Sequence, residues 1–150
     1  MIELRFHLEP FASQSVRQGK SWSGRKIFYQ PEEVKAYKAN IIAATKNQIK
    51  DLPYFEMFPR SCPLSVMITY CFQYRKKERK KYMSKLPHRH VPKITWPDVN
   101  DNLQKPLMDA LAGIVFEQDQ QIFDIRARKF WWREDLITVS ITPYLHKDHL

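Results

Sequence analysis

The sequence predicts one α+β domain over residues 1–150, with a mixed β-sheet packed by two main helices in the order β-α-β-α-β-β. The length of 150 residues fits a single domain, and a hydrophobic fraction of 43% is enough for one core. Four segments alternate apolar and polar residues, and two carry apolar residues at helical spacing. No internal repeat divides the chain, so we expect a single sheet with helices packed against it.

The first half of the chain predicts a strand, a long loop, a helix and a second strand. Residues 2–8 alternate apolar and charged side chains, which indicates a half-buried strand. Residues 11–30 are rich in Ser, Gln, Gly and basic residues, and predict a long loop of the kind that is more often functional than idle. Pro31 and two glutamates then begin a helix over 31–50. Clean alternation over 64–72 predicts the second strand.

The second half predicts a helix and two further strands. Leu103, Leu107 and Leu111 recur at every fourth position and form an apolar stripe. Pro106 lacks a backbone donor and is tolerated only near a helix start, so we expect this helix to begin late. Two alternating segments, 123–127 and 137–141, predict strands, and the residues REDL between them predict a hairpin turn.

Positive charge is concentrated in one segment. The net charge is +9, and residues 75–93 hold nine Lys or Arg and one Glu, which leaves +8 there. Such a block favours nucleic acid as a partner, although a solvated loop that aids solubility would have the same composition. We expect nucleic acid to be bound by cations of the loop 11–30 and of the basic segment: Arg17, Lys20, Arg25, Lys26, Arg75, Lys76, Lys77, Arg79, Lys80, Lys81, Lys85, Arg89 and Lys93.

Several classes of protein are disfavoured by composition. Only three glycines occur and no glycine-rich phosphate loop is present. No apolar run reaches 18 residues, and the N-terminus lacks the apolar block of a secretory signal, so we expect no membrane partner. The two cysteines, Cys62 and Cys71, lack metal-site spacing and are interpreted as core or strand residues of a reduced, cytoplasmic protein.

The stretch PDVNDNLQKPLMDAL, residues 97–111, concentrates acid directly after the basic segment. On a helix, Asp101, Lys105 and Asp109 form a polar stripe on the side away from the leucines. A capping aspartate followed by ion pairs four residues apart would explain this stripe without any chemistry, with Asp109 as partner of Lys105.

A metal site is the alternative interpretation of the same acids. Asp98 lies just upstream of Asp101, and Asp119 follows the helix at the head of the next strand. Converging carboxylates repel one another unless a cation intervenes, and oxygen ligands suit Mg²⁺ or Mn²⁺. We therefore predict Asp98, Asp101 and Asp119 as metal ligands, with Lys105 contacting a phosphate whose charge grows in the transition state.

The segment DNLQKPLMDALAGIVFEQDQQI, residues 101–122, resembles the RusA family of Holliday junction resolvases, which are crossover junction endodeoxyribonucleases. The family pattern runs D-x-D-N-L-x-K, then D-A-L, then D-D-x-Q-[IV]. The resemblance implies a small, homodimeric, Mg²⁺-dependent DNA endonuclease of recombination and repair, often encoded by phages and prophages, which nicks two strands of a four-way junction symmetrically. It implies catalytic roles for Asp101, Lys105 and Asp119.

The chain departs from the family pattern before and after the helix. Asp98 stands three residues before Asp101 where the family spacing is two, and Asn100 is an apparent insertion. A one-residue bulge would return both carboxylates to one side of a strand. Otherwise Asn100 or water fills the ligand position, and activity would be weak. Gln118 stands where the family often has Asp.

Two other functions remain compatible with the sequence. The displaced Asp98 leaves open a catalytically weak or inactive protein of a phage or mobile element that binds branched nucleic acid. A nuclease of the same architecture that acts on flaps or replication forks would carry the same residues. Phe130, Trp131 and Trp132 are interpreted as core or dimer surface, or alternatively as rings that stack on DNA bases.

Overall fold

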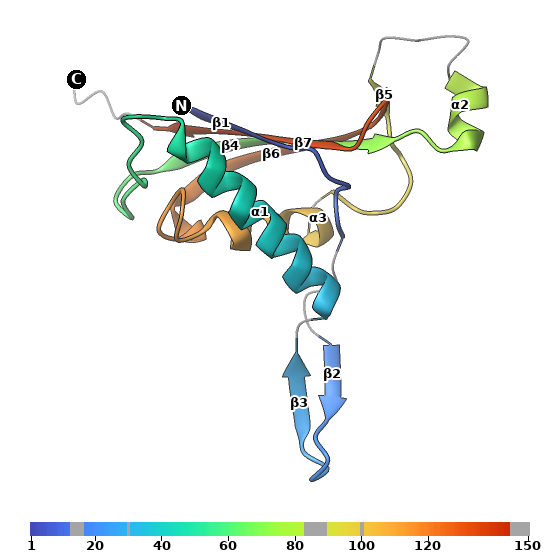
Figure 1. Ribbon diagram of the computed structural model, residues 1–150, viewed down its shortest axis with the longest axis horizontal. Helices are drawn as coiled ribbons and strands as arrows, with labels where there is room; N and C mark the ends of the chain where they lie inside the picture. Colours follow the sequence, from blue (N-terminus) through green and yellow to red (C-terminus); the bar gives the residue numbers. More distant parts are fainter. Residues whose placement is uncertain (13–16, 30, 83–89, 100, 145–150) are drawn as a thin grey trace.

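The computed structural model describes residues 1–12, 17–29, 31–82, 90–99 and 101–144, and it confirms a mixed sheet covered by helices. Five strands form the main sheet in the order β1-β7-β4-β6-β5, and β2 and β3 form a separate pair (Figure 1). The elements are β1 (Ile2–Phe6), β2 (Arg17–Lys20), β3 (Lys26–Tyr29), α1 (Glu32–Lys50), β4 (Leu64–Gln73), α2 (Lys76–Tyr82), β5 (Val91–Pro92), α3 (Asp101–Leu111), the 3-10 helix η1 (Asp119–Gln121), β6 (Ile122–Trp132) and β7 (Leu136–Pro143).

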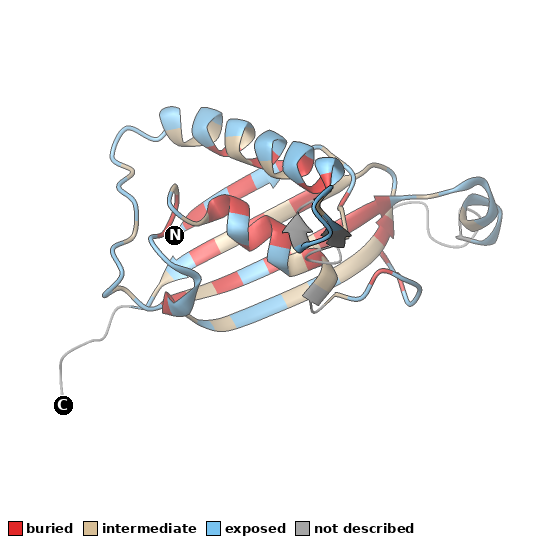
Figure 2. Ribbon diagram, turned by 90° about the horizontal axis from the view of Figure 1, so that it is seen from below, coloured by how far each residue is buried: buried red, intermediate tan, exposed pale blue. Residues whose placement is uncertain are grey.

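The core lies between one face of the sheet and the helices α1 and α3, which lie side by side across it (Figure 2). The alternation of each strand explains this, because every second side chain points to the helices and is apolar. β1, β4 and β7 supply the sheet side, and α1 and α3 supply the other. The main buried residues are Leu4, Phe6, Tyr37, Ile41, Val66, Ile68, Leu103, Leu107, Leu111, Val139 and Ile141. No helix in the described part of the chain is long and apolar enough to cross a membrane.

The pairing of β4 with β6 determines where the ends of α3 lie. The two strands are parallel, with Val66 opposite Ile125 and Phe72 opposite Trp131. Parallel neighbours require a crossover connection, and α3 is the helix of that crossover. The helix therefore begins toward the end of the sheet where β4 and β6 terminate, and it runs back toward the end where β6 begins.

The predicted hairpin between the last two strands is wrong. β6 and β7 both pair with β4 and lie on opposite sides of it, so the connection after Trp132 passes over the end of β4. Asp135 in that connection accepts a hydrogen bond from the backbone N–H of Gln73 at 2.8 Å. Strand alternation cannot distinguish a hairpin from this arrangement, because both leave the same pattern of buried residues.

Residues 11–30 and 75–93 contain more regular structure than predicted. Within 11–30, β2 and β3 form an antiparallel hairpin that projects from the body of the domain (Figure 1). Its turn is closed by hydrogen bonds from Ser21 N to Arg25 O and from Gly24 N to Ser21 O, both 2.8 Å, and Gly24 has a φ of +82°. That backbone conformation favours glycine. The basic segment includes the helix α2 and the short strand β5.

The predicted late start of the second helix is also wrong. α3 begins at Asp101, and Pro106 lies inside it. A proline in a helix interior costs about 3 kcal/mol. Leu103, Leu107 and Leu111 are all fully buried on the same helix, and burying each leucine is worth roughly 1.5–3 kcal/mol. Burial of the apolar stripe therefore offsets the proline.

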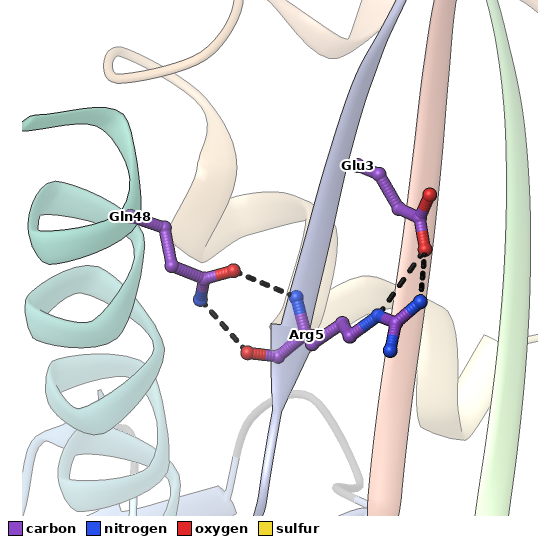
Figure 3. A network of polar contacts seen from close by, with 3 residues as sticks. All are labelled: Glu3, Arg5 and Gln48. Atoms are coloured by element: carbon purple, nitrogen blue, oxygen red, sulfur yellow. Dashed lines mark hydrogen bonds and ion pairs between the residues drawn. The ribbon is translucent and has the colours of Figure 1, made fainter. Parts of the chain in front are cut away.

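The outer edge of β1 is capped by a side chain from α1 (Figure 3). Gln48 Oε1 accepts from the backbone N–H of Arg5 at 2.9 Å, and Gln48 Nε2 donates to the carbonyl of Arg5 at 2.8 Å. The amide thus takes the place of one residue of a neighbouring strand. An open strand edge is a template for pairing with another chain, and this contact occupies part of that edge.

We predict that Gln48→Leu lowers the free energy of unfolding by about 1 kcal/mol, because it removes two partly solvated hydrogen bonds. The measurement is urea unfolding followed by circular dichroism. Asn47→Leu, on the exposed neighbouring residue of α1, is the matched control. Equal stability of the two variants would contradict a structural role for the Gln48 amide.

Candidate active site

The loop that leads to Asp98 is held by two lysines. Lys93 Nζ donates to Thr95 Oγ1 and to Trp96 O, both at 2.6 Å. Lys129 Nζ, from β6, donates to Thr95 O at 2.6 Å and to Pro97 O at 2.5 Å. Three successive carbonyls are therefore bound by ammonium groups immediately before Asp98, and the exposed Asp98 follows this fixed backbone.

Lys93 is buried, although it was expected to contact nucleic acid. Its side chain is only 6% exposed, and its ammonium lies 4.4 Å from the ring centre of Trp131 and 5.1 Å from that of Phe72. Desolvation lowers the pKa of Lys93, and the nearby charges of Lys129 and Arg75 lower that pKa further. The Lys93 ammonium thus contacts the loop before Asp98 on one side and the rings of Phe72 and Trp131 on the other.

The loop before α3 is not a strand, so alternation along a strand does not decide where Asp98 points. Residues 94–99 have no strand pairing, and Asn100, where a bulge was predicted, lies outside the described residues. Asp101 is the first residue of α3, but its side chain is outside the described part as well. The ligand role of Asp101 therefore stays a prediction.

The polar stripe of α3 differs from the expected ion-pair ladder. Asp109 Oδ2 accepts from Lys38 Nζ of α1 at 3.2 Å, so the two helices are joined there and Asp109 is not the partner of Lys105. Lys105 is exposed and forms no ion pair with any described side chain. Its ammonium is consequently available to an anion that approaches the N-terminal half of α3.

Asp119 lies in η1, and Gln121 fixes this turn. Gln121 is buried, and its Oε1 accepts from Gln118 N at 3.0 Å. Its Nε2 donates to Pro59 O at 3.1 Å and to Cys62 O at 3.0 Å. The amide of Gln121 therefore attaches the turn to the segment before β4, and the exposed Asp119 projects from a defined backbone.

Asp98 follows a loop that is bound to the C-terminal half of β6, whereas Asp119 directly precedes the start of β6. The loop before Asp98 is bound to Lys129, and β6 begins at Ile122, directly after η1. Seven residues of strand separate Ile122 from Lys129, which is about 23 Å at 3.3 Å per residue. The turn after α3 stays at the far end, where Phe58 N donates to Val115 O at 2.9 Å. Among the described residues, no three His, Cys, Asp or Glu side chains gather in a way that could hold a metal ion.

The predicted nucleic-acid residues form two separate basic surfaces. One is the hairpin tip, where Lys20, Arg25 and Lys26 are exposed. The other is α2, which lies beyond one end of the sheet (Figure 1). The exposed cations of α2 and of the residue before it are Arg75, Lys76, Lys77, Arg79, Lys80 and Lys81. Lys85, Arg89 and the side chain of Arg17 lie outside the described residues.

Two residues of this region were not anticipated from the sequence. Trp22 is fully exposed at the tip of the hairpin, and only its position among small polar and basic residues, KSWSGRK, hinted at this. The role of Lys129 could not be predicted from its place in an alternating strand, because its hydrogen-bond partners are backbone carbonyls of another segment. Trp131 is core, whereas Trp132 stacks on His90 with ring centres 4.0 Å apart.

Comparison with known proteins identifies the family. A family model described as endodeoxyribonuclease RusA matches residues 8–142, which is most of the chain. The chain therefore belongs to the RusA endodeoxyribonuclease family, and the activity of that family is, in general, the resolution of Holliday junctions. A search among curated proteins found no match.

We predict that Lys93→Met releases the loop before Asp98, because Trp96 O and Thr95 Oγ1 lose a charged donor. The expected loss is about 2 kcal/mol in the free energy of unfolding. Amide hydrogen exchange should also accelerate in residues 94–99. Lys46→Met, on the exposed face of α1, is the control. Unchanged exchange in residues 94–99 would refute the role assigned to Lys93.

Proposed function

From membership of the RusA family, we propose that this protein is a Mg²⁺-dependent endonuclease that resolves four-way DNA junctions by symmetric nicking. The observation that carries the proposal is the match over residues 8–142, which spans the acidic loop, α3 and the turn that holds Asp119. The hydrogen-bonded backbone before Asp98 and around Asp119 supports a site that is ordered before DNA binds. Catalysis that depends on positioning the reacting groups requires such order.

The two basic surfaces support a branched partner rather than a single straight duplex. The hairpin projects from the helix side of the sheet, and α2 extends from one end of it (Figure 1). Cations in two directions can each neutralise the phosphates of a different arm. We propose that the hairpin and α2 guide separate DNA arms past α3, and that Trp22 contributes an aromatic face to the same contact.

The donor chemistry of the candidate ligands suits a hard divalent cation. Asp98 and Asp119 are exposed carboxylates, and Asp101 adds a third by its place in the family pattern. Mg²⁺, or Mn²⁺ in its place, takes oxygen ligands and would supply polarisation of the phosphodiester when bound. Among the side chains that the structure describes, no three acids gather into such a ligand set, and the side chain of Asp101 lies outside them.

Lys105 is proposed to stabilise the negative charge that develops on the phosphate. Lys105 is exposed and lies one turn from the start of α3. A preplaced cation is worth more in the transition state than in the ground state, because charge grows on the phosphate oxygens during hydrolysis. Removing it should therefore affect the rate more than the affinity.

We expect Lys105→Met to lower the nicking rate of a synthetic four-way junction by about 10²-fold with little loss of binding. Asp119→Asn and Asp98→Asn should abolish nicking and leave binding intact, since these acids do not contact the DNA backbone directly in the proposal. Lys46→Met is the matched control. The assay is single-turnover cleavage with Mg²⁺ or Mn²⁺, run on junction, fork and linear duplex.

A second prediction concerns the hairpin. Substitution of Lys20, Arg25 and Lys26 by Gln should make the dependence of binding on salt less steep, by about one unit of log–log slope for each phosphate that the variant no longer neutralises. The control replaces Lys46, Lys50 and Arg60 by Gln, which also lowers the net charge from +9 to +6. Equal slopes for the two triple variants would exclude a specific role for the hairpin.

These measurements also separate the catalytic proposal from a protein that only binds branched DNA. Such a protein would bind junctions in EDTA as in Mg²⁺ and would leave them uncut at any metal concentration. That outcome would reject the endonuclease proposal for this chain and would retain the branched-DNA partner.

A further inference from the structure

The face of the main sheet that points away from α1 and α3 contains a groove. Both helices lie on one side of the sheet in Figure 1, and neither covers the opposite face. The groove has a volume of about 420 Å³, and residues of β1, β4, β6 and β7 line it. We call it the sheet groove, and the lining residues that determine its chemistry are Arg5, His90, Arg128, Trp132, Arg133 and Glu134.

The sheet groove is separate from the candidate active site. Lys129 of β6 donates to carbonyls of the loop before Asp98. Side chains alternate along a strand, so Arg128 and Phe130 point to the face opposite to Lys129. Both of them line the groove. The groove therefore lies across the sheet from the loop that leads to Asp98, and none of the candidate metal ligands lines it.

One row of side chains crosses the floor of the sheet groove. Thr138 of β7 pairs with Arg5 of β1 on one side and with Thr69 of β4 on the other, and Thr69 pairs with Arg128 of β6. Three spacings between neighbouring strands separate the backbones of the two arginines, which is about 14 Å. The threonines between them are small and carry hydroxyls. The row thus places two cations on either side of a low, polar floor.

The charge of the groove is positive. Its lining holds three arginines and one glutamate, which leaves +2 with neutral histidines. The side chains of Arg5 and Arg133 are 64% and 77% exposed. Arg5 Nη2 lies 2.9 Å from Glu3 Oε1, and Arg133 Nε lies 4.0 Å from Glu134 Oε1. Such exposed ion pairs contribute little, so these guanidinium groups remain able to bind an anion.

A stack of rings borders the same groove. The ring of His90 lies 4.0 Å from that of Trp132, at an angle of 33°, and 5.2 Å from that of Phe130. Burial and the nearby charge of Arg128 lower the pKa of His90, so its imidazole is neutral at pH 7. His90 is exposed, whereas the other two rings are half-buried. The stack therefore ends on a neutral ring that a further flat ring can contact.

The groove continues into the basic surface of α2. Tyr74 N donates to Trp132 O at 3.0 Å, and the exposed cations of α2 begin directly after Tyr74. A chain of phosphates that leaves the groove beside Trp132 therefore meets further positive charge. Flat rings beside a continuous line of cations are the features by which proteins bind an unpaired nucleic-acid strand.

We propose that the sheet groove binds an unpaired stretch of a DNA strand, with a base stacked on His90 and phosphates bound by Arg5 and Arg128. A stacked strand has one phosphate per 3.4 Å or so, so the distance of about 14 Å between the arginine backbones spans several nucleotides. Bases inside a duplex already stack on one another, so the ring of His90 selects an unpaired base. The proposal rests on the proposed function for DNA as the partner, and it uses none of the acids.

The phosphate contacts are tested by the anisotropy of fluorescent oligo(dT) in EDTA over a range of salt. Arg5→Gln combined with Arg128→Gln should make the log–log salt slope less steep by about 1.4, since each phosphate contact on a single strand contributes about 0.7. Lys46→Gln combined with Lys50→Gln, on the exposed face of α1, removes the same charge and is the control. On a duplex of equal length the two double variants should bind alike.

Two outcomes of this titration would overturn the proposal. Equal slopes for the two double variants on oligo(dT) would show that the groove arginines bind no phosphate. A loss on the duplex as large as that on oligo(dT) would show a surface for any DNA backbone and not for an unpaired strand.

The stacking contact is tested by His90→Ala, which should weaken binding of oligo(dT) about 10-fold. His90→Phe keeps a flat ring and should bind as the unmodified chain does, which separates stacking from a loss of folding. His7→Ala removes another imidazole of the groove, outside the stack, and is the control. An abasic oligomer of equal length should not distinguish His90→Ala from the unmodified chain. Equal losses on the abasic oligomer and on oligo(dT) would refute the stacking of a base.

Nicking of a four-way junction by the same variants separates this proposal from the proposed function. If the unmodified chain nicks junctions but the groove variants bind oligo(dT) as their controls do, the groove is wrong and the endonuclease stands. If the unmodified chain does not nick but the groove variants lose oligo(dT) as expected, the endonuclease is wrong and the groove stands.

Discussion

The parallel pairing of β4 with β6 is the constraint on which the arrangement of the site depends. Parallel neighbours cannot be joined by a tight turn, so the chain must return from the C-terminal end of β4 to the N-terminal end of β6. The helix α3 is part of that return. Asp101 begins the crossover helix and Asp119 follows its end. The same pairing therefore places Asp101 and Asp119 at the two ends of the crossover helix, although the family pattern contains both within one short motif.

Burial of polar groups holds each half of the site in place. Lys93 and Gln121 are both buried, and both direct their side-chain donors to backbone carbonyls of irregular segments. The lysine serves the loop before Asp98, and the glutamine serves the turn of Asp119. Leaving either buried side-chain donor unpaired is unfavourable, so the backbone next to each acid has few alternatives.

The sequence predicted what local pattern controls. Alternation identified β1, β4, β6 and β7, and helical spacing identified the buried leucines of α3. The family motif selected Asp101, Lys105 and Asp119, whose catalytic roles stay predictions. The sequence could not predict that β7 and β6 lie on opposite sides of β4, because the buried pattern is the same in a hairpin. Nor could it predict that Lys93 is buried, since its partners are carbonyls, which every residue carries.

The treatment of the two sheet edges differs in a way that local stability does not explain. At β1, Gln48 hydrogen-bonds to the backbone of Arg5 and blunts the edge, whereas among the described residues no strand pairs with the outer side of residues 122–128 of β6. Edges are usually blunted because pairing with another chain leads to aggregation.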